Sequence, residues 1–233
     1  MCHAKRLRQP LEQALEAIDV YGLLLFSDPA LPSVVGMIVG QPIRGSWWGH
    51  PRGAVIYRTM NALEDQPDVL TAKLIAGKVT YIHRRLWPAL LAVATARAPW
   101  QVDGLSPGAG WLLRLTDVEG EVQTHDLPPL PPALGLQRKR VPDMARELER
   151  RLLVHATEVH TPSGAHAKVL QSWQRWAASV TPGPVSISVE VARGQLGQAA
   201  ERLAAAAHAA VVPLPWQCAR GSQPRTPSVA DSF

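Results

Sequence analysis

The spacing of apolar residues predicts three helices in the first third of the chain. Leu11, Leu15, Ile18 and Leu25 recur near helical spacing, which predicts a helix over residues 10–26. A short second helix is expected over residues 33–39, with Ser33 as its N-cap and Gly40 after its end. Residues 54–64 predict a third helix, because their apolar positions fall on one side.

The period of the pattern then changes from helical to alternating. Residues 69–75 and 79–84 alternate apolar and polar positions around a Gly77-Lys78 turn, which is typical of a β-hairpin. Residues 87–97 return to helical composition, with Pro88 in the first turn. Three helices followed by a hairpin is the order of a winged helix, so the third helix is the expected recognition helix and the hairpin the wing.

A weaker copy of this order follows. Residues 106–119 predict a helix capped by Ser106, and residues 121–126 a short strand. A proline-rich loop over 127–142 carries the basic cluster Arg138-Lys139-Arg140, and a helix is expected over 143–153. Then come a predicted strand (153–161), a turn (162–164) and a helix (165–178) buried through Val169, Trp173 and Trp176.

The end of the chain predicts an extension and a tail. Residues 185–191 alternate like a half-buried strand, residues 195–210 form an alanine-rich helix, and the chain from residue 217 is expected to be disordered. The predicted class is therefore α+β, mainly helical. It has winged-helix-like modules at 10–100 and 105–180, a strand–helix extension at 181–216 and a tail at 217–233.

Composition narrows the function classes. The 233 residues are 46% hydrophobic with a formal net charge of +5, which permits a polyanionic partner. Two cysteines near opposite ends give no metal or disulfide framework, and no signal peptide or bilayer-spanning run is visible. We therefore expect a cytoplasmic protein with no membrane partner. Phosphate-binding loops, dinucleotide fingerprints, nucleophile elbows and zinc-helix motifs are missing from the sequence, and no cofactor is expected.

The loop before the third helix is the first candidate site. Residues 45–53 contain Trp47, Trp48, His50 and Arg52 beside a helix N-terminus, a combination that can stack a base and hold a phosphate. The structural alternative is that a tryptophan fills the core while glycines shape the loop.

The third helix and the wing supply further cations. Arg58 on the helix and Lys73, Lys78, His83 and Arg84 on the hairpin suit contacts to nucleic-acid phosphates. The alternative is a solvated hairpin whose lysines protect its edge.

A third candidate combines one carboxylate with two imidazoles. Glu158 and His160 share a face of the predicted strand, and His166 follows the turn, so the three can bind a metal or do acid–base chemistry. The alternative is a capped turn with histidines facing solvent. No metal ligand is assigned here, because no further carboxylate or cysteine completes a familiar metal pattern.

Three segments carry a family resemblance: residues 45–52, 79–88 and 158–168. Together they resemble an uncharacterised family of bacterial winged-helix-like proteins, over about residues 10–180. The chain is also distantly similar to bacterial tandem winged-helix DNA glycosylases, whose Gln-apolar-Asp catalytic motif is matched by Gln101-Val102-Asp103. The first resemblance implies fold rather than activity, and the second implies a hydrolase that acts on damaged DNA.

Three functions are therefore kept. The leading one is binding of double-stranded DNA, with Arg52 and Arg58 toward the major groove and Lys73 and Lys78 toward phosphates. The second is a glycosylase-type hydrolase in which Asp103 or Glu158 activates water. The third is a protein-interaction scaffold, and the sequence leaves the oligomeric state open.

Overall fold

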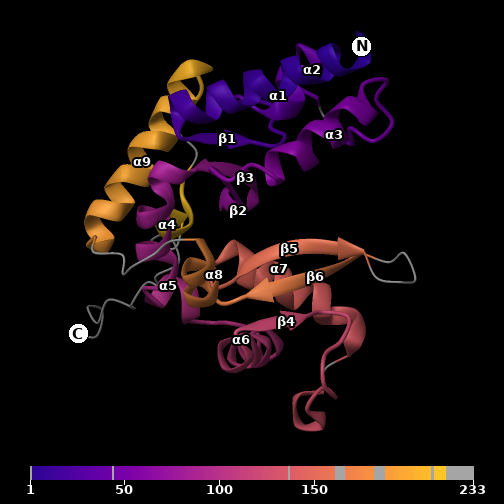
Figure 1. Ribbon diagram of the computed structural model, residues 1–233. Helices are drawn as coiled ribbons and strands as arrows, with labels where there is room; N and C mark the ends of the chain where they lie inside the picture. The colour runs from indigo at the N-terminus through magenta and orange to yellow at the C-terminus, as the bar shows by residue number, and fades with distance from the viewer. Residues whose placement is uncertain are drawn as a thin grey trace, which may run out of the picture.

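The computed structural model describes residues 2–43, 45–135, 137–160, 166–180, 187–210 and 213–218. Within them the chain is α+β, with ten α-helices and two antiparallel sheets of three strands each. The two sheets lie in the upper and lower halves of the molecule in Figure 1. Among the described helices, none is long and apolar enough to cross a membrane.

The first module holds the first sheet. Its elements are α1 (Cys2–Tyr21), β1 (Leu23–Leu25), α2 (Val34–Val39), α3 (Gly53–Glu64), β2 (Val69–Ile75) and β3 (Lys78–His83). The strands pair antiparallel in the order β1-β3-β2, so β3 is central (Figure 1).

Short-range chemistry explains where these elements begin and end. The Ser33 hydroxyl accepts a hydrogen bond from the Gly36 amide at the start of α2, and Gly40 ends that helix with a φ of +83°. Ala76 and Gly77 both have positive φ values, which suit the tight turn of a two-residue hairpin between β2 and β3. The predicted second helix, third helix and hairpin are therefore confirmed.

The second module repeats the order. It contains α6 (Pro107–Glu119), β4 (Glu121–Gln123), the 3₁₀ turns η2 (Pro132–Leu134) and η3 (Arg138–Arg140), α7 (Val141–Arg150), β5 (His155–His160) and β6 (His166–Gln171). Its sheet order is β4-β6-β5, the same arrangement as in the first sheet. Its own apolar core is centred on α6 and α7, with Leu112 and Leu148 fully buried.

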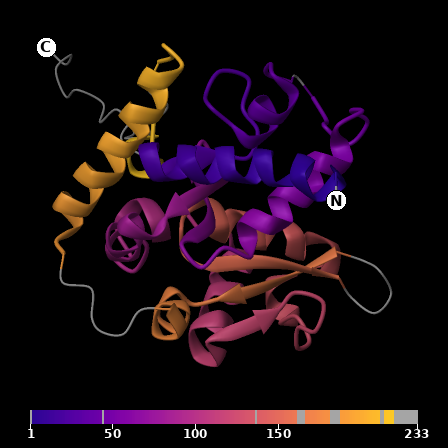
Figure 2. The ribbon, with the colours of Figure 1, turned by 45° about the horizontal axis from the view of Figure 1, so that its top comes forward.

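The remaining elements extend the core of the first module. After β3 come η1 (Arg84–Leu86), α4 (Trp87–Ala94) and α5 (Pro99–Val102), and after β6 come α8 (Trp173–Val180), α9 (Val189–Ala206) and α10 (Pro215–Cys218). Figure 2 shows α9 as a long helix across one end of α1. Buried residues of α4, α8 and α9 belong to the same core as β1 and β3.

Four predictions about elements are wrong. The first helix stops at Tyr21, because Gly22 takes a φ of +83° and the apolar residues after it form β1. Residues 166–171 are strand β6 rather than helix, because they pair with both β4 and β5. The predicted half-buried strand at 185–191 is helical from Val189, where Ser188 caps α9. Gln217 lies in α10, so the tail does not begin there.

Two predictions fall on other parts of the chain. The predicted turn at 162–164 and the part of the predicted tail after residue 218 lie outside the described residues.

Candidate functional site

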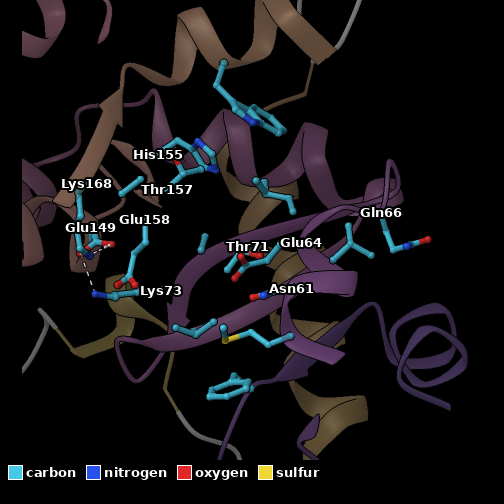
Figure 3. A pocket seen from close by; sticks show the side chains of 18 of the residues that line it. Asn61, Glu64, Gln66, Thr71, Lys73, Glu149, His155, Thr157, Glu158 and Lys168 are labelled. Atoms are coloured by element: carbon cyan, nitrogen blue, oxygen red, sulfur yellow. Dashed lines mark hydrogen bonds and ion pairs between the residues drawn. The ribbon is translucent and has the colours of Figure 1, made fainter. Parts of the chain in front are cut away.

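A cleft of about 500 Å³ lies between the two modules (Figure 3). One wall comes from α3 and β2 of the first module, and the other from the end of α7 and from β5 and β6 of the second. The lining is largely apolar with a few ionisable groups, which is the usual character of a small-molecule site. No local sequence pattern predicts this cleft, because its walls come from segments about 80 residues apart.

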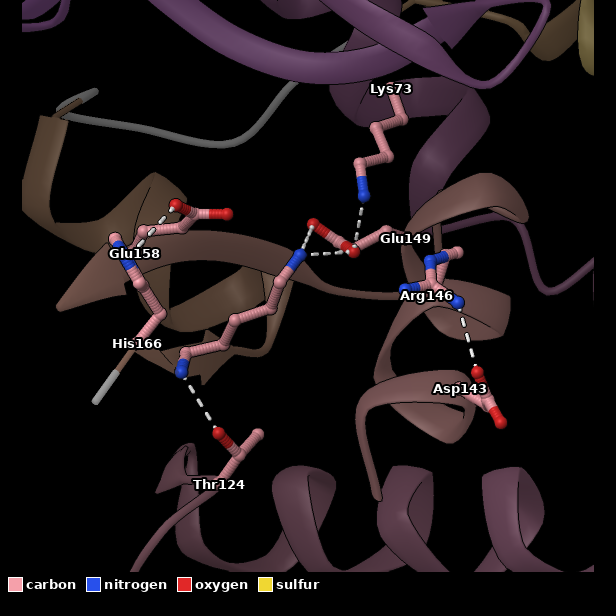
Figure 4. Close-up of polar contacts among 8 residues, drawn as sticks. Lys73, Thr124, Asp143, Arg146, Glu149, Glu158 and His166 are labelled. Atoms are coloured by element: carbon pink, nitrogen blue, oxygen red, sulfur yellow. Dashed lines mark hydrogen bonds and ion pairs between the residues drawn. The ribbon is translucent and has the colours of Figure 1, made fainter. Parts of the chain in front are cut away.

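Glu149 joins the two modules at one end of the cleft. Its carboxylate accepts hydrogen bonds from the ammonium groups of Lys73, at 2.8 Å, and Lys168, at 2.6 Å (Figure 4). The Glu149 side chain is 9% exposed and the two lysines about a fifth. Burial lowers the pKa of Lys73, although the hydrogen bond to Glu149 acts in the opposite direction. Lys73 therefore holds the modules together and does not present a free cation to phosphate.

Two further carboxylates line the same cleft. Glu158 on β5 lies 3.9 Å from Nδ1 of His166 on β6 (Figure 4). The Glu64 carboxylate, at the end of α3, has no hydrogen bond or ion pair with any described residue. Partial burial, then the negative charges of Glu158 and Asp65, raise the pKa of Glu64.

The expected meeting of Glu158 and His166 is confirmed, although a hairpin rather than a helix start brings them together. The backbone of His160 pairs with that of His166 across the hairpin. In the described parts of the chain, no group of three or more His, Cys, Asp and Glu side chains can hold a metal ion.

His155 lies deeper, against two tryptophans. Its ring is 5.5 Å from the ring of Trp173 and 5.6 Å from that of Trp176. Burial lowers the pKa of His155 to about 4, although Glu149 and a hydrogen bond with the Gln171 side chain act in the opposite direction. The imidazole is therefore neutral at physiological pH.

Aromatic rings form a stack at another part of the cleft. Trp48 stacks on Trp47 at 4.3 Å and lies 5.9 Å from the ring of Tyr57 on α3. Trp47 packs edge-on against Phe26 and is half-buried. This ring therefore packs against the core, as the structural alternative for the loop expected. Trp48 is 66% exposed, which leaves it open to a ligand.

The cations predicted on the third helix are committed to nearby backbone. The Arg52 guanidinium donates to the carbonyl oxygen of Ile38, at the end of α2. Nε of Arg58 donates to the carbonyl oxygen of Ala54 at 3.0 Å, one turn back on its own helix. Nδ1 of His50 accepts from the Arg52 amide, which fixes the loop before α3.

The predicted wing cations also have partners in the first module. Nζ of Lys78 lies 2.5 Å from the buried carboxylate of Asp28, and Arg84 lies 3.3 Å from Asp68. Nδ1 of His83 accepts from the Arg85 amide. Lys78 and Arg84 are therefore each paired with a carboxylate of the same module.

A more basic surface lies on the second module. Five exposed cations occur on η3 and on one side of α7, and we call them the α7 basic surface: Arg138, Lys139, Arg140, Arg146 and Arg150. One carboxylate, that of Asp143, is shared by Arg140 at 3.2 Å and Arg146 at 2.9 Å. Lys139 and Arg150 make no hydrogen bond or ion pair within the described ranges.

The Arg138-Lys139-Arg140 cluster was predicted in a loop, and in the structure it forms the 3₁₀ turn η3. The density of cations around the start of one predicted helix was the signal that would have found the α7 basic surface.

The first module's hairpin packs against the C-terminal end of this helix. A Cβ added at Gly77, in the turn of the hairpin, would lie 3.2 Å from Cγ of Arg150. This contact and the Lys73–Glu149 pair place the first module against the C-terminal end of α7.

The glutamine of Gln101-Val102-Asp103 has a structural role. Its side chain is fully buried, and Nε2 donates to the carbonyl oxygens of Ala94, Arg151 and Leu152. Its Oε1 accepts from the Ala98 amide at 3.0 Å. Neither Gln101 nor the exposed Asp103 lines the cleft, so the two do not form a catalytic pair there.

Gln101→Ala is expected to lower the free energy of unfolding by about 2 kcal/mol, because buried carbonyl groups lose their donor. Asp103→Asn is the control and should change it by less than about 0.5 kcal/mol, since that side chain is exposed. Urea unfolding followed by circular dichroism measures both. Equal stability of Gln101→Ala and wild type would contradict the structural role.

No family model, curated protein or solved structure matches the chain.

Proposed function

We propose that the protein binds double-stranded DNA through two winged-helix-like modules, with the α7 basic surface facing the duplex. The observation that carries this proposal is the charge of that surface, where five exposed cations accompany one exposed carboxylate, that of Asp143. Lysine and arginine contacts to phosphates supply most of the affinity in non-specific DNA binding.

The position of α7 in its module supports the proposal. Both modules run helix, strand, helical segment, helix and hairpin, with the first strand paired to the last in each sheet. In this order α7 corresponds to the recognition helix, and recognition helices contact base edges through their N-terminal residues. Three of the five cations lie on η3, directly before the N-terminus of α7, and the other two are Arg146 and Arg150 in its second half.

This proposal moves the DNA contacts from the first module to the second. Lys73, Lys78 and Arg84 are in ion pairs within the protein, and such a pair must be broken or screened before its cation can bind phosphate, which weakens the electrostatic gain. Arg52 and Arg58 keep their charge, but each guanidinium is held by a backbone carbonyl oxygen. The Gln101-Val102-Asp103 motif does not favour the hydrolase, because Gln101 is buried and Asp103 lies away from the cleft.

The test is fluorescence anisotropy with a labelled random-sequence duplex across a salt series. Binding by the wild type should weaken steeply with salt. Lys139→Ala with Arg146→Ala should weaken binding by about tenfold at low salt and reduce the salt slope by about two, since each lost phosphate contact removes roughly one.

The matched control is Arg58→Ala with Arg84→Ala, which also removes two cations but from the first module. Its affinity should stay close to that of the wild type. Absence of wild-type binding at low salt, or a larger loss in the control than in the α7 variant, would overturn the proposal.

A further inference from the structure

Two carboxylates, those of Glu64 and Glu158, line one part of the cleft, and no lysine or arginine among the described residues pairs with either. The two residues come from different modules, Glu64 from the end of α3 and Glu158 from β5 (Figure 3). Glu64 has no bonded partner among the described residues, and the histidine beside Glu158 is a weak counterion that is charged only when protonated. A cation placed between the two carboxylates would relieve their repulsion.

The lysines of the cleft do not offset this charge. Lys73 and Lys168 both bind the Glu149 carboxylate, at 2.8 and 2.6 Å, and their ammonium groups are largely withdrawn from solvent. An anionic ligand would have to compete with Glu149 for them. The charged groups of the cleft that remain available to a ligand are therefore the carboxylates of Glu64 and Glu158, which favour a positively charged ligand.

The aromatic lining favours an organic cation over an inorganic one. Trp48 and Tyr57 line the same cleft, and Trp48 is held in place by its stack on Trp47 while most of its ring remains exposed. Indole and phenol faces attract organic cations and also cover apolar groups. A metal ion is disfavoured, because the described residues hold no cluster of three ligands.

We propose that the cleft between the modules binds a small organic cation with a flat apolar body, such as an aromatic amine or amidine. Glu64 and Glu158 receive the charged group, and Trp48 and Tyr57 contact the apolar part. The cavity of about 500 Å³ lies in the size range of small-molecule sites. This site does not depend on DNA binding, because the α7 basic surface consists of other residues.

The direct test is isothermal titration calorimetry of the full chain, without DNA, at pH 8 with benzamidine as the probe. Benzamide, which has nearly the same shape and no charge, is the matched ligand control. Benzamidine is expected to give saturable one-to-one binding, and benzamide to bind at least about tenfold more weakly.

Variants assign the binding to the cleft. Glu64→Gln with Glu158→Gln should weaken benzamidine binding by about tenfold or more, while Trp48→Ala should weaken both ligands. Glu12→Gln with Glu16→Gln removes the same charge from the exposed side of α1 and should leave binding unchanged.

Thermal unfolding of each variant checks that the fold is retained, and removal of two repelling carboxylates should not lower stability. No saturable binding of benzamidine, equal binding of benzamide, or equal losses in the two double variants would overturn the proposal.

Discussion

Glu149→Ala is expected to lower the free energy of unfolding by about 3 kcal/mol. The substitution leaves the ammonium groups of Lys73 and Lys168 mostly buried without a counterion, and breaking a buried pair from one side typically costs about 3–5 kcal/mol. The lower end applies, because both lysines retain about a fifth of their exposure. Since Lys73 belongs to the first module and Lys168 to the second, the loss should also loosen the contact between the modules.

Urea unfolding measures this change, and a second variant separates charge from packing. Glu149→Leu combined with Lys73→Met and Lys168→Met replaces all three ionic groups by apolar ones of similar size. This variant should recover most of the lost stability, because no buried charge remains unpaired. If Glu149→Ala unfolds at the wild-type urea concentration, the three charges do not hold the modules together.

Stability is expected to fall by up to about 3 kcal/mol between pH 6.5 and pH 4 because of His155 alone. The pKa of His155 is lowered to about 4 in the folded protein, while an unfolded histidine titrates near its ordinary value of 6.5. Above pH 6.5 both states are neutral and His155 contributes no pH dependence. Below it the unfolded state takes up a proton that the folded state refuses, so folding becomes less favourable until pH 4.

The measurement compares wild type with His155→Gln in urea unfolding at several pH values. Carboxylates titrate in both proteins, so the difference between the two curves isolates His155. The free energy of unfolding of the wild type should fall steadily relative to that of His155→Gln as the pH falls from 6.5 to 4. Parallel curves over this window would show that the imidazole accepts a proton in the folded state.

Local signals were sufficient to predict most elements of the first module. Ser33 caps α2, Gly40 ends it, and the turn at Gly77 divides two alternating runs, so each boundary has a cause within a few residues. The end of the first helix was missed because Leu25 continues a helical spacing across Gly22. The positive φ of Gly22 was the deciding local feature.

Elements that depend on distant partners were not predictable in the same way. Val169 in strand β6 and the tryptophans Trp173 and Trp176 of α8 recur at helical spacing, so the whole segment resembled one helix in the sequence. However, β6 is a strand because β4 and β5 lie on its two sides, and propensity gives way to such pairing. The alternating run at 185–191 was predicted as a strand, but it is helical from Val189 because Ser188 caps α9.

The candidate site shows the same division. The pairing of Glu158 with His166 follows from a hairpin within nine residues and was predicted from the sequence. The pairing of Lys73 with Glu149 joins positions 76 residues apart, and no local pattern reveals it. Whether a cation is free or paired decides which surface can bind a polyanion, and this information exists only in the folded chain.

An NMR titration of the ¹⁵N-labelled protein with a short DNA duplex shows which surface of the protein faces the duplex. If it is the α7 basic surface, we expect shifts of backbone amides over residues 138–150, with smaller changes over α3. Shifts centred on residues 53–64, or an unchanged spectrum at low salt, would contradict it.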